Sequence, residues 1–233
     1  GNKFKGISMI ITIDGPVASG KSSVAKVLAE KLDIYYLYTG LLYRAVAYIL
    51  IDKLRKPDLK TIEKYLDGIK PEDISWIHNI SYEYKNEEAN VFFEEKEIAK
   101  YLHDVSLEQF ASIVSANEYV RNALFDLQRK IAEKNDVIAE GRDCGTVIFP
   151  NADYKFYLTS SLETRAYRLA HDERRGEVNP DIEKIKKEIE IRDKRDKERV
   201  VAPLAIPENA IIIDNSELTL SETISEFLSF IKT

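Results

Sequence analysis

Residues 15–22 are the stretch of this chain whose chemistry is easiest to interpret; they are Gly-Pro-Val-Ala-Ser-Gly-Lys-Ser. They fit the pattern G-x-x-x-x-G-K-[ST], in which glycines let the backbone wrap an anion without Cβ clashes. Backbone N–H groups and the start of the next helix would face a nucleotide phosphate. Lys21 would bridge the β- and γ-phosphates, and the Ser22 hydroxyl would bind the Mg²⁺ that accompanies ATP. The residues expected to bind ATP are Gly15, Pro16, Val17, Ala18, Ser19, Gly20, Lys21, Ser22 and Ser23.

The flanking residues favour this interpretation over an ordinary glycine turn with an exposed lysine. Residues 9–14 are apolar and β-branched, as in a buried strand, and residues 21–32 repeat apolar side chains at helical spacing. A phosphate loop predicts nucleotide binding but no particular reaction. The base-reading [N/T]-K-x-D signature of GTPases is absent, so the rest of the chain must indicate the acceptor.

Arginines beside short polar or acidic residues recur along the chain and predict a second anion site. Seven arginines fall in residues 165–199: Arg165, Arg168, Arg174, Arg175, Arg192, Arg195 and Arg199. Such a run is usually a solvated helix with ion pairs, but a guanidinium also binds phosphate oxygens bidentately. Arg192, Arg195, Asp196 and Arg199 have the spacing of one helical face. Further candidates are Thr39, Tyr43, Arg44, Ser112, Arg121, Glu140, Arg142 and Asp143.

Composition limits the classes of protein that this chain can be. It has 233 residues, 44% hydrophobic and 32% charged, which is enough for one large domain or a core with inserts and excludes disorder as the main state. A single cysteine, Cys144, excludes a disulfide framework and a cysteine zinc site. The net charge of −6 argues against a nucleic-acid-binding protein. With no membrane-spanning run or signal peptide, we expect a cytoplasmic protein. Residues 1–8 are either a tag remnant or a native arm.

Apolar periodicity predicts strands and helices that alternate, which is typical of an α/β fold with a parallel sheet. Strands are expected at 9–14, 34–38, 137–140, 155–158 and 210–214. Helices are expected at 21–32, 41–54, 60–66, 98–114, 118–134, 163–171, 181–200 and 220–231. A small hairpin of strands 80–84 and 91–95 interrupts the alternation, so the region around it is interpreted as an insert.

Taken together, these motifs resemble the bacterial-type cytidylate kinases, which are P-loop nucleoside monophosphate kinases. The resemblance covers essentially the whole chain from Met9 onward. Its most specific parts are EGRDCGTVIFP at 140–150 and IRDKRDKERVVAPL at 191–204. Further matches are ITIDGPVASGKSSVAK at 11–26, YTGLLYRA at 38–45, ASIVSANEYVRNAL at 111–124 and IIIDNS at 211–216.

The resemblance implies a three-layer α/β/α fold with a parallel five-stranded sheet. It divides the chain into a first core part (9–66), an inserted α+β domain that binds the monophosphate (67–120) and a second core part (121–233). A short lid is expected near 168–180. The implied reaction moves the γ-phosphoryl group of ATP, with Mg²⁺, to CMP or dCMP. The implied partners are these small molecules alone, with no nucleic acid or membrane, and the implied state is a monomer.

The resemblance also assigns roles by position. The CMP site would consist of Thr39, Arg44, Ser112, Arg121, Glu140, Arg142, Asp143, Arg192, Asp196 and Arg199. Among these, Arg44, Arg142 and Arg192 are expected at the acceptor phosphate, and Asp196 at a sugar hydroxyl. Ser112, Arg121, Asp143 and Arg199 are expected at the base. Lys21, Arg165 and Arg168 would be catalytic, the two arginines acting from the lid over ATP.

Three positions depart from the family pattern. Tyr38 stands where an Asp is usual, Leu169 replaces a lid arginine, and Glu140 replaces a common Asp. If the missing Asp organises Mg²⁺-bound water, either Asp14 or Glu140 replaces it or the protein handles the metal less well. The alternatives are a kinase for another small acceptor such as UMP or shikimate, a nucleotide-binding protein without turnover, and an RNA-binding protein that uses the arginine-rich window.

Overall fold

The computed structural model describes residues 8–232, and residues 1–7, where a tag remnant or a native arm was expected, lie outside it. A five-stranded parallel sheet has the order β2-β6-β1-β7-β8. Its strands are β1 (Ile10–Asp14), β2 (Tyr35–Tyr38), β6 (Val137–Gly141), β7 (Tyr154–Thr159) and β8 (Ile211–Asp214). The expected parallel sheet is confirmed, and the phosphate loop follows the central strand β1.

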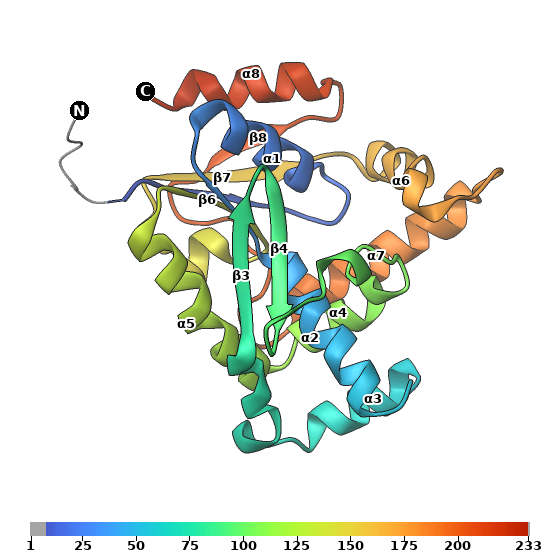
Figure 1. Ribbon diagram of the computed structural model, residues 1–233. Coiled ribbons are helices and arrows are strands. Elements are labelled where there is room, and N and C mark those ends of the chain that lie inside the picture. The colour runs from blue at the N-terminus through green and yellow to red at the C-terminus, as the bar shows by residue number, and fades with distance from the viewer. Residues whose placement is uncertain (1–7, 233) are drawn as a thin grey trace.

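Helices cover both faces of this sheet (Figure 1), which confirms the three-layer α/β/α fold. Helices α1 (Lys21–Leu32) and α8 (Leu220–Phe230) lie on one face, where Leu28 and Phe227 pack against Phe156 of β7. Helices α2 (Thr39–Lys53) and α5 (Glu118–Lys134) lie on the other, where Leu42 and Leu124 join a core with Ala139 of β6. The rigid strand ends between these layers position the site.

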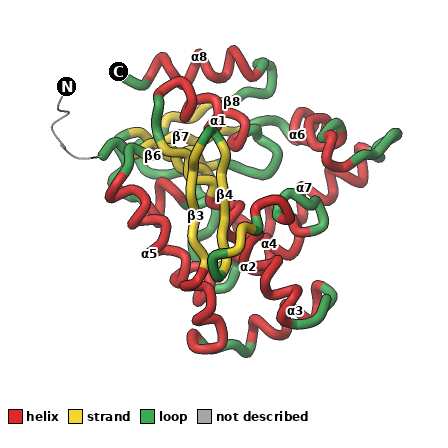
Figure 2. Tube along the Cα trace, in the orientation of Figure 1, coloured by secondary structure: helices red, strands yellow, loops and turns green. Residues whose placement is uncertain are grey.

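Residues 67–120 contain the expected interruption of the α/β alternation. After α3 (Leu59–Asp67) come η1 (Pro71–Asn79), β3 (Ile80–Lys85), β4 (Glu88–Phe93), β5 (Lys96–Glu97), η2 (Ala99–Tyr101) and α4 (Leu107–Ser115). The three strands form a separate antiparallel sheet, visible as the long hairpin in Figure 2. Val91 of this hairpin shares one hydrophobic core with Leu50 of α2 and Leu124 of α5. That the segment binds the monophosphate as a domain stays a prediction.

The hairpin and the segment after it differ from the boundaries predicted by the sequence. The gap expected between the two strands, residues 85–90, is only a two-residue turn at Asn86 and Glu87, whose φ angles are left-handed at 52° and 62°. Such a turn matches the twist of the paired strands, so the polar residues around it belong to them. The helix expected at 98–114 begins only at Leu107, because Asp104 accepts from the N–H of Ser106 at 2.8 Å in the intervening turn.

Tyrosine hydroxyls from both the hairpin and β2 attach the hairpin to the outer edge of β2. The Tyr82 hydroxyl donates to the carbonyl of Tyr36 at 2.7 Å and accepts from the N–H of Tyr38 at 3.1 Å. The Tyr35 hydroxyl accepts from the N–H of Tyr84 at 2.8 Å. These phenols satisfy backbone groups that an edge strand would leave unpaired, so the insert is fixed beside the strand that leads into the site.

The segment between α6 (Leu162–Ala170) and α7 (Ile182–Glu198), called the lid below, includes the short helix η4 (Glu173–Arg175). That it closes over the site stays a prediction. Asp172 begins η4 by accepting from the N–H of Arg174. Gly176 ends it with a left-handed φ of 61°. Among the described residues, no helix has the length and apolar character needed to cross a membrane.

Candidate active site

The phosphate loop is shaped by glycines at two positions with different requirements. Gly20 has a φ of 93°, a left-handed conformation that starts α1 and that side chains rarely adopt. A Cβ on Gly15 would lie 2.1 Å from the backbone oxygen of Leu158, so only glycine lets the loop pass this close to β7. The two glycines therefore fix the path of the loop into α1, whose N-terminus is suited to stabilise a phosphate.

Lys21 is buried at the base of this loop. Its Nζ donates to the carbonyl of Pro16 at 2.7 Å and to the Ser19 hydroxyl at 3.4 Å. Burial, followed by repulsion from Arg142 and Arg192, lowers the pKa of Lys21 to about 7. The side chain is thus held in place before any nucleotide binds, in surroundings where a nearby anion would favour its charged form.

Ser22 and Glu140 provide the oxygen atoms that suit a nucleotide-bound Mg²⁺. The Ser22 hydroxyl donates to Glu140 Oε1 at 2.9 Å, and the Tyr36 hydroxyl donates to the same oxygen at 3.2 Å. A hydroxyl and a carboxylate are hard ligands of the kind Mg²⁺ takes alongside phosphate oxygens. The residues present therefore fit the metal. Tyr38, the departure from the family pattern, stacks on Tyr36 with ring centroids 5.9 Å apart.

Asp14, the other carboxylate considered for the metal, has a structural task. Its two oxygens accept the N–H groups of Cys144 at 2.8 Å and Gly145 at 2.7 Å. Burial raises the pKa of Asp14 to about 7. Since both oxygens are used to hold the turn after β6, Glu140 is the better placed of the two carboxylates. Burial likewise raises the pKa of the Cys144 thiol, as expected of a buried side chain that packs and does not act as a nucleophile.

One cavity of about 390 Å³ joins the loop to the arginines. Lys21 and Ser22 lie on its loop side, and all ten residues expected to bind CMP also line it. They come from α2, α4, α5, the end of β6 and α7. Segments that lie far apart in the sequence thus face a single space.

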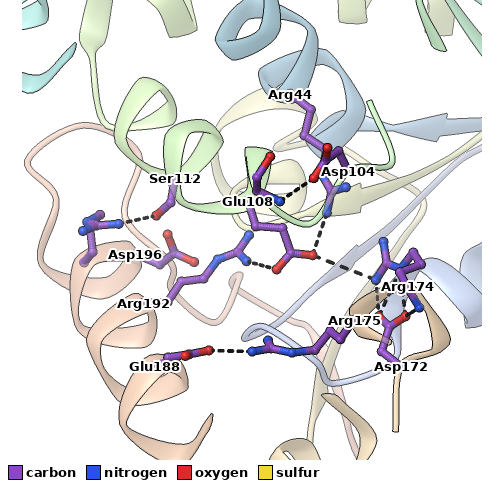
Figure 3. A network of polar contacts seen from close by, with 12 residues as sticks. Arg44, Asp104, Glu108, Ser112, Asp172, Arg174, Arg175, Glu188, Arg192 and Asp196 are labelled. Atoms are coloured by element: carbon purple, nitrogen blue, oxygen red, sulfur yellow. Dashed lines mark hydrogen bonds and ion pairs between the residues drawn. The ribbon is translucent and has the colours of Figure 1, made fainter. Parts of the chain in front are cut away.

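At one end of the cavity, arginines are paired with carboxylates. Arg142 Nε donates to Asp196 Oδ2 at 2.8 Å, and Arg44 Nη2 donates to Glu108 Oε1 at 3.0 Å. Arg192 Nη1 lies 3.5 Å from Glu108 Oε2 (Figure 3), while its Nε is buried and has no hydrogen-bond partner. Burial, followed by repulsion from Arg142, lowers the pKa of Arg192. Three guanidiniums that converge in this way are suited to an anion.

The other end is more deeply buried. Arg121 is 1% exposed, pairs with Asp143, and donates to the carbonyl of Ser115 at 2.8 Å. Arg199 donates to the carbonyl of Ala202 at 2.8 Å. Arg121 Nε and Arg199 Nη2 are buried without partners, so this end has donors to offer. A pyrimidine with ring acceptors and an amino group would match such donors beside a carboxylate.

The structure does not bring every predicted residue to the cavity. Arg168 lines it and is held by the side chain and carbonyl of Asn215 at 3.0 and 2.9 Å. Arg165 pairs with Asp193 at 2.7 Å and donates to the carbonyl of Val17, so it supports the phosphate loop from behind. Arg195 is directed to the Ser112 hydroxyl at 3.1 Å. Arg199 follows the end of α7 and does not share its helical face.

Sequence reasoning gave no role to three charged residues of the cavity wall, and it named Tyr43 only as a candidate for the anion site. Tyr43 lies beneath Arg121, whose guanidinium carbon is 5.1 Å from the ring centroid. Glu108, Asp172 and Arg174 enter the cavity from α4 and the lid. The signal for Glu108 was its spacing of four residues from Ser112, which places both on one face of α4. Arg174 was noted only as part of the arginine-rich window.

A phosphate loop after the central strand of a parallel sheet, opening on a cavity walled by arginines, is the construction of a P-loop kinase. The family is narrower than this class. A family model described as cytidylate kinase matches residues 11–233, so the chain belongs to the cytidylate kinase family.

Individual relatives agree with the family. A cytidylate kinase of Bdellovibrio bacteriovorus is 37% identical over 228 residues, covering 97% of this chain and 99% of the relative. A cytidylate kinase of Thermodesulfovibrio yellowstonii is 39% identical over 219 residues, which cover 93% of this chain and 94% of the relative. The crystal structure of an uncharacterized protein from Eubacterium ventriosum superposes with a TM-score of 0.54 at 17% identity. The match covers 96% of this chain and 98% of that protein, which shows a shared fold.

Proposed function

We propose that this enzyme transfers the γ-phosphoryl group of ATP, with Mg²⁺, to CMP or dCMP and so serves pyrimidine nucleotide metabolism. The observation that carries the proposal is the single cavity of about 390 Å³, which joins the phosphate loop to ten residues of the expected monophosphate site. A triphosphate on the loop and a monophosphate among the arginines would then lie in one space. That juxtaposition is what direct transfer between two nucleotides requires.

Positioning and charge neutralisation account for most of the catalysis in this mechanism. The loop and Lys21 hold the donor, and Arg44, Arg142 and Arg192 orient the acceptor phosphate for in-line attack. Because that phosphate is already ionised near neutral pH, the protein needs no general base. Bound Mg²⁺ supplies charge neutralisation on the phosphate oxygens, and Ser22 and Glu140 are the residues that would hold it. No phosphoenzyme forms.

Water competes with the acceptor, so the cavity must exclude it before transfer. The lid is suited to this task because Asp172 and Arg174 already line the cavity. Arg168, which is held by Asn215, can add positive charge near the transferred group. In this proposal Arg165 acts on the loop backbone through Val17 and does not contact ATP.

A coupled assay of ADP release tests the function, with ATP and Mg²⁺ and one acceptor at a time. The acceptors are CMP, dCMP, UMP, AMP and shikimate. We expect ADP to form with CMP or dCMP at a rate well above that with the others. Preferred turnover of UMP, AMP or shikimate would assign another acceptor, and nucleotide binding without acceptor-dependent ADP release would indicate a binding protein.

A further inference from the structure

Glu108 holds an unusual place in the cavity, because one carboxylate meets arginines from three separate elements. Its Oε1 accepts from Arg44 of α2 at 3.0 Å and lies 3.9 Å from Arg174 Nη2 of the lid. Its Oε2 lies 3.5 Å from Arg192 Nη1 of α7. Figure 3 shows the carboxylate between the three guanidiniums. Arginine pairs with carboxylates and phosphates through the same fork of N–H donors, so Glu108 sits where a phosphate could be bound.

The arginines around Glu108 have more hydrogen-bond donors than its carboxylate can accept. Two of its partners, Arg44 and Arg192, are arginines that the proposed function assigns to the acceptor phosphate. Arg192 keeps a buried Nε without a hydrogen-bond partner. A phosphate offers more acceptor oxygens than a carboxylate and would satisfy donors that Glu108 leaves open.

Glu108 is also not required to hold its surroundings together. Helix α4 is anchored by buried Leu107, Ala111 and Val114. Arg44 has a second anchor, since its Nη1 donates to the carbonyl of Leu102 at 3.0 Å. Removing the carboxylate therefore leaves both the helix and the Arg44 guanidinium in place.

We propose that Glu108 is an internal substitute for the acceptor phosphate, which occupies the arginines in the free enzyme and gives them up when the nucleotide binds. This inference rests on the proposed function and adds a specificity-determining residue to it. An acceptor must displace a carboxylate from Arg44 and Arg192 to bind. An anionic acceptor can do so, whereas a neutral nucleoside gains nothing from the arginines in exchange.

The test is to measure dissociation constants by calorimetry for CMP, inorganic phosphate and cytidine with the wild type and E108Q. We expect E108Q to lower the Kd for CMP roughly fivefold, equivalent to about 1 kcal/mol, because a competing ion pair is lost. The Kd for inorganic phosphate should fall similarly and that for cytidine should stay the same. The matched control is E188Q, which removes a carboxylate that pairs with Arg175 at 3.0 Å outside the cavity and should bind CMP as the wild type does.

A second variant separates displacement from a general change of charge. E108D keeps the charge but shortens its reach toward the arginines, so CMP should again bind more tightly than to the wild type. An unchanged Kd in E108D would mean that Glu108 acts only through its field, and the inference would be wrong. It would also be wrong if E108Q bound CMP no better, or if cytidine gained as much as CMP. Thermal unfolding checks that each variant folds, and E108D decides if E108Q does not.

Failure of the proposed function has a different result. A wild type that does not bind CMP or release ADP with it would remove the assigned acceptor. A wild type that does both, with no gain in E108Q, would remove only the role of Glu108.

Discussion

The two ends of the cavity, which we propose receive the phosphoryl donor and the acceptor, are built in different ways. At the donor end, one continuous segment supplies backbone N–H groups and Lys21, whose Nζ is held by the carbonyl of Pro16. At the acceptor end, side chains from many elements meet, and most arginines there are paired with carboxylates such as Asp143, Asp196 and Glu108.

This difference has a functional meaning. The donor end can receive a triphosphate with little change, because its groups are local and its backbone donors are fixed by the turn. At the acceptor end, the balance of ion pairs must be adjusted when an anion binds, because the arginines already have partners. We therefore expect the donor end to determine catalysis and the acceptor end to determine both stability and choice of substrate.

The largest effect should come from the buried pair at the acceptor end. Arg121→Ala leaves Asp143 as an uncompensated buried charge, which should cost about 3–5 kcal/mol of the free energy of unfolding. Urea denaturation measures this. The control is Arg129→Ala, an exposed arginine on the same helix that donates only to backbone carbonyls at 3.3 Å. A loss no greater than that of the control would contradict the comparison.

The same variant also sharpens the assignment of the base site. Arg121→Ala should weaken turnover of CMP more than the binding of ATP, because its guanidinium is proposed to contact the base and touches no residue of the phosphate loop that binds ATP. An equal loss with CMP, UMP and AMP would instead remove Arg121 from recognition of the base.

The next effect concerns the donor end and catalysis alone. Lys21→Ala should lower kcat about 100- to 1000-fold, or about 3–4 kcal/mol, by analogy with other donors that stabilise developing negative charge. Its stability should change far less than in Arg121→Ala. Lys26→Ala, on an exposed position of the same helix, is the control for turnover. Near-normal turnover in Lys21→Ala would contradict the proposed mechanism.

The smallest effect is a dependence on pH. The pKa of Lys21 lies near 7, below its ordinary 10.5, and ATP should draw it upward by stabilising the charged form. The affinity for ATP should therefore fall as pH rises above 7, by at most about tenfold per unit for one proton. Calorimetry at pH 6.5, 7.5 and 8.5 measures this against Lys21→Arg, whose side chain stays charged and should lack the added slope.

In the free enzyme the same pKa shift makes the free energy of unfolding rise with pH, whereas the affinity for ATP falls. The unfolded chain holds the Lys21 proton more tightly than the folded chain does, so unfolding takes up a proton between pH 7 and 10.5. Lys21 therefore contributes more stability as pH rises through this range. Equal slopes of stability against pH in the wild type and Lys21→Arg would contradict this contribution.

The contrast between the two ends also explains what the sequence could predict. Residues 15–22 are contiguous, so their spacing alone predicts the phosphate loop at the donor end. Helix α1 has the predicted bounds of 21–32. The acceptor end depends on tertiary contacts. Arg165 and Arg174 look alike in the sequence, yet the first contacts Val17 and Asp193 while the second reaches Glu108. No local pattern distinguishes an arginine that supports a loop from one that lines a cavity.

The attachment of the hairpin to β2 has a consequence beyond the site. Strand edges with free N–H and carbonyl groups invite pairing with strands of other molecules. The Tyr82 phenol occupies the carbonyl of Tyr36 and the N–H of Tyr38, so these two groups of β2 are not available to a foreign strand. We therefore expect the hairpin to reduce strand pairing of β2 with other molecules as well as to hold this strand beside the cavity.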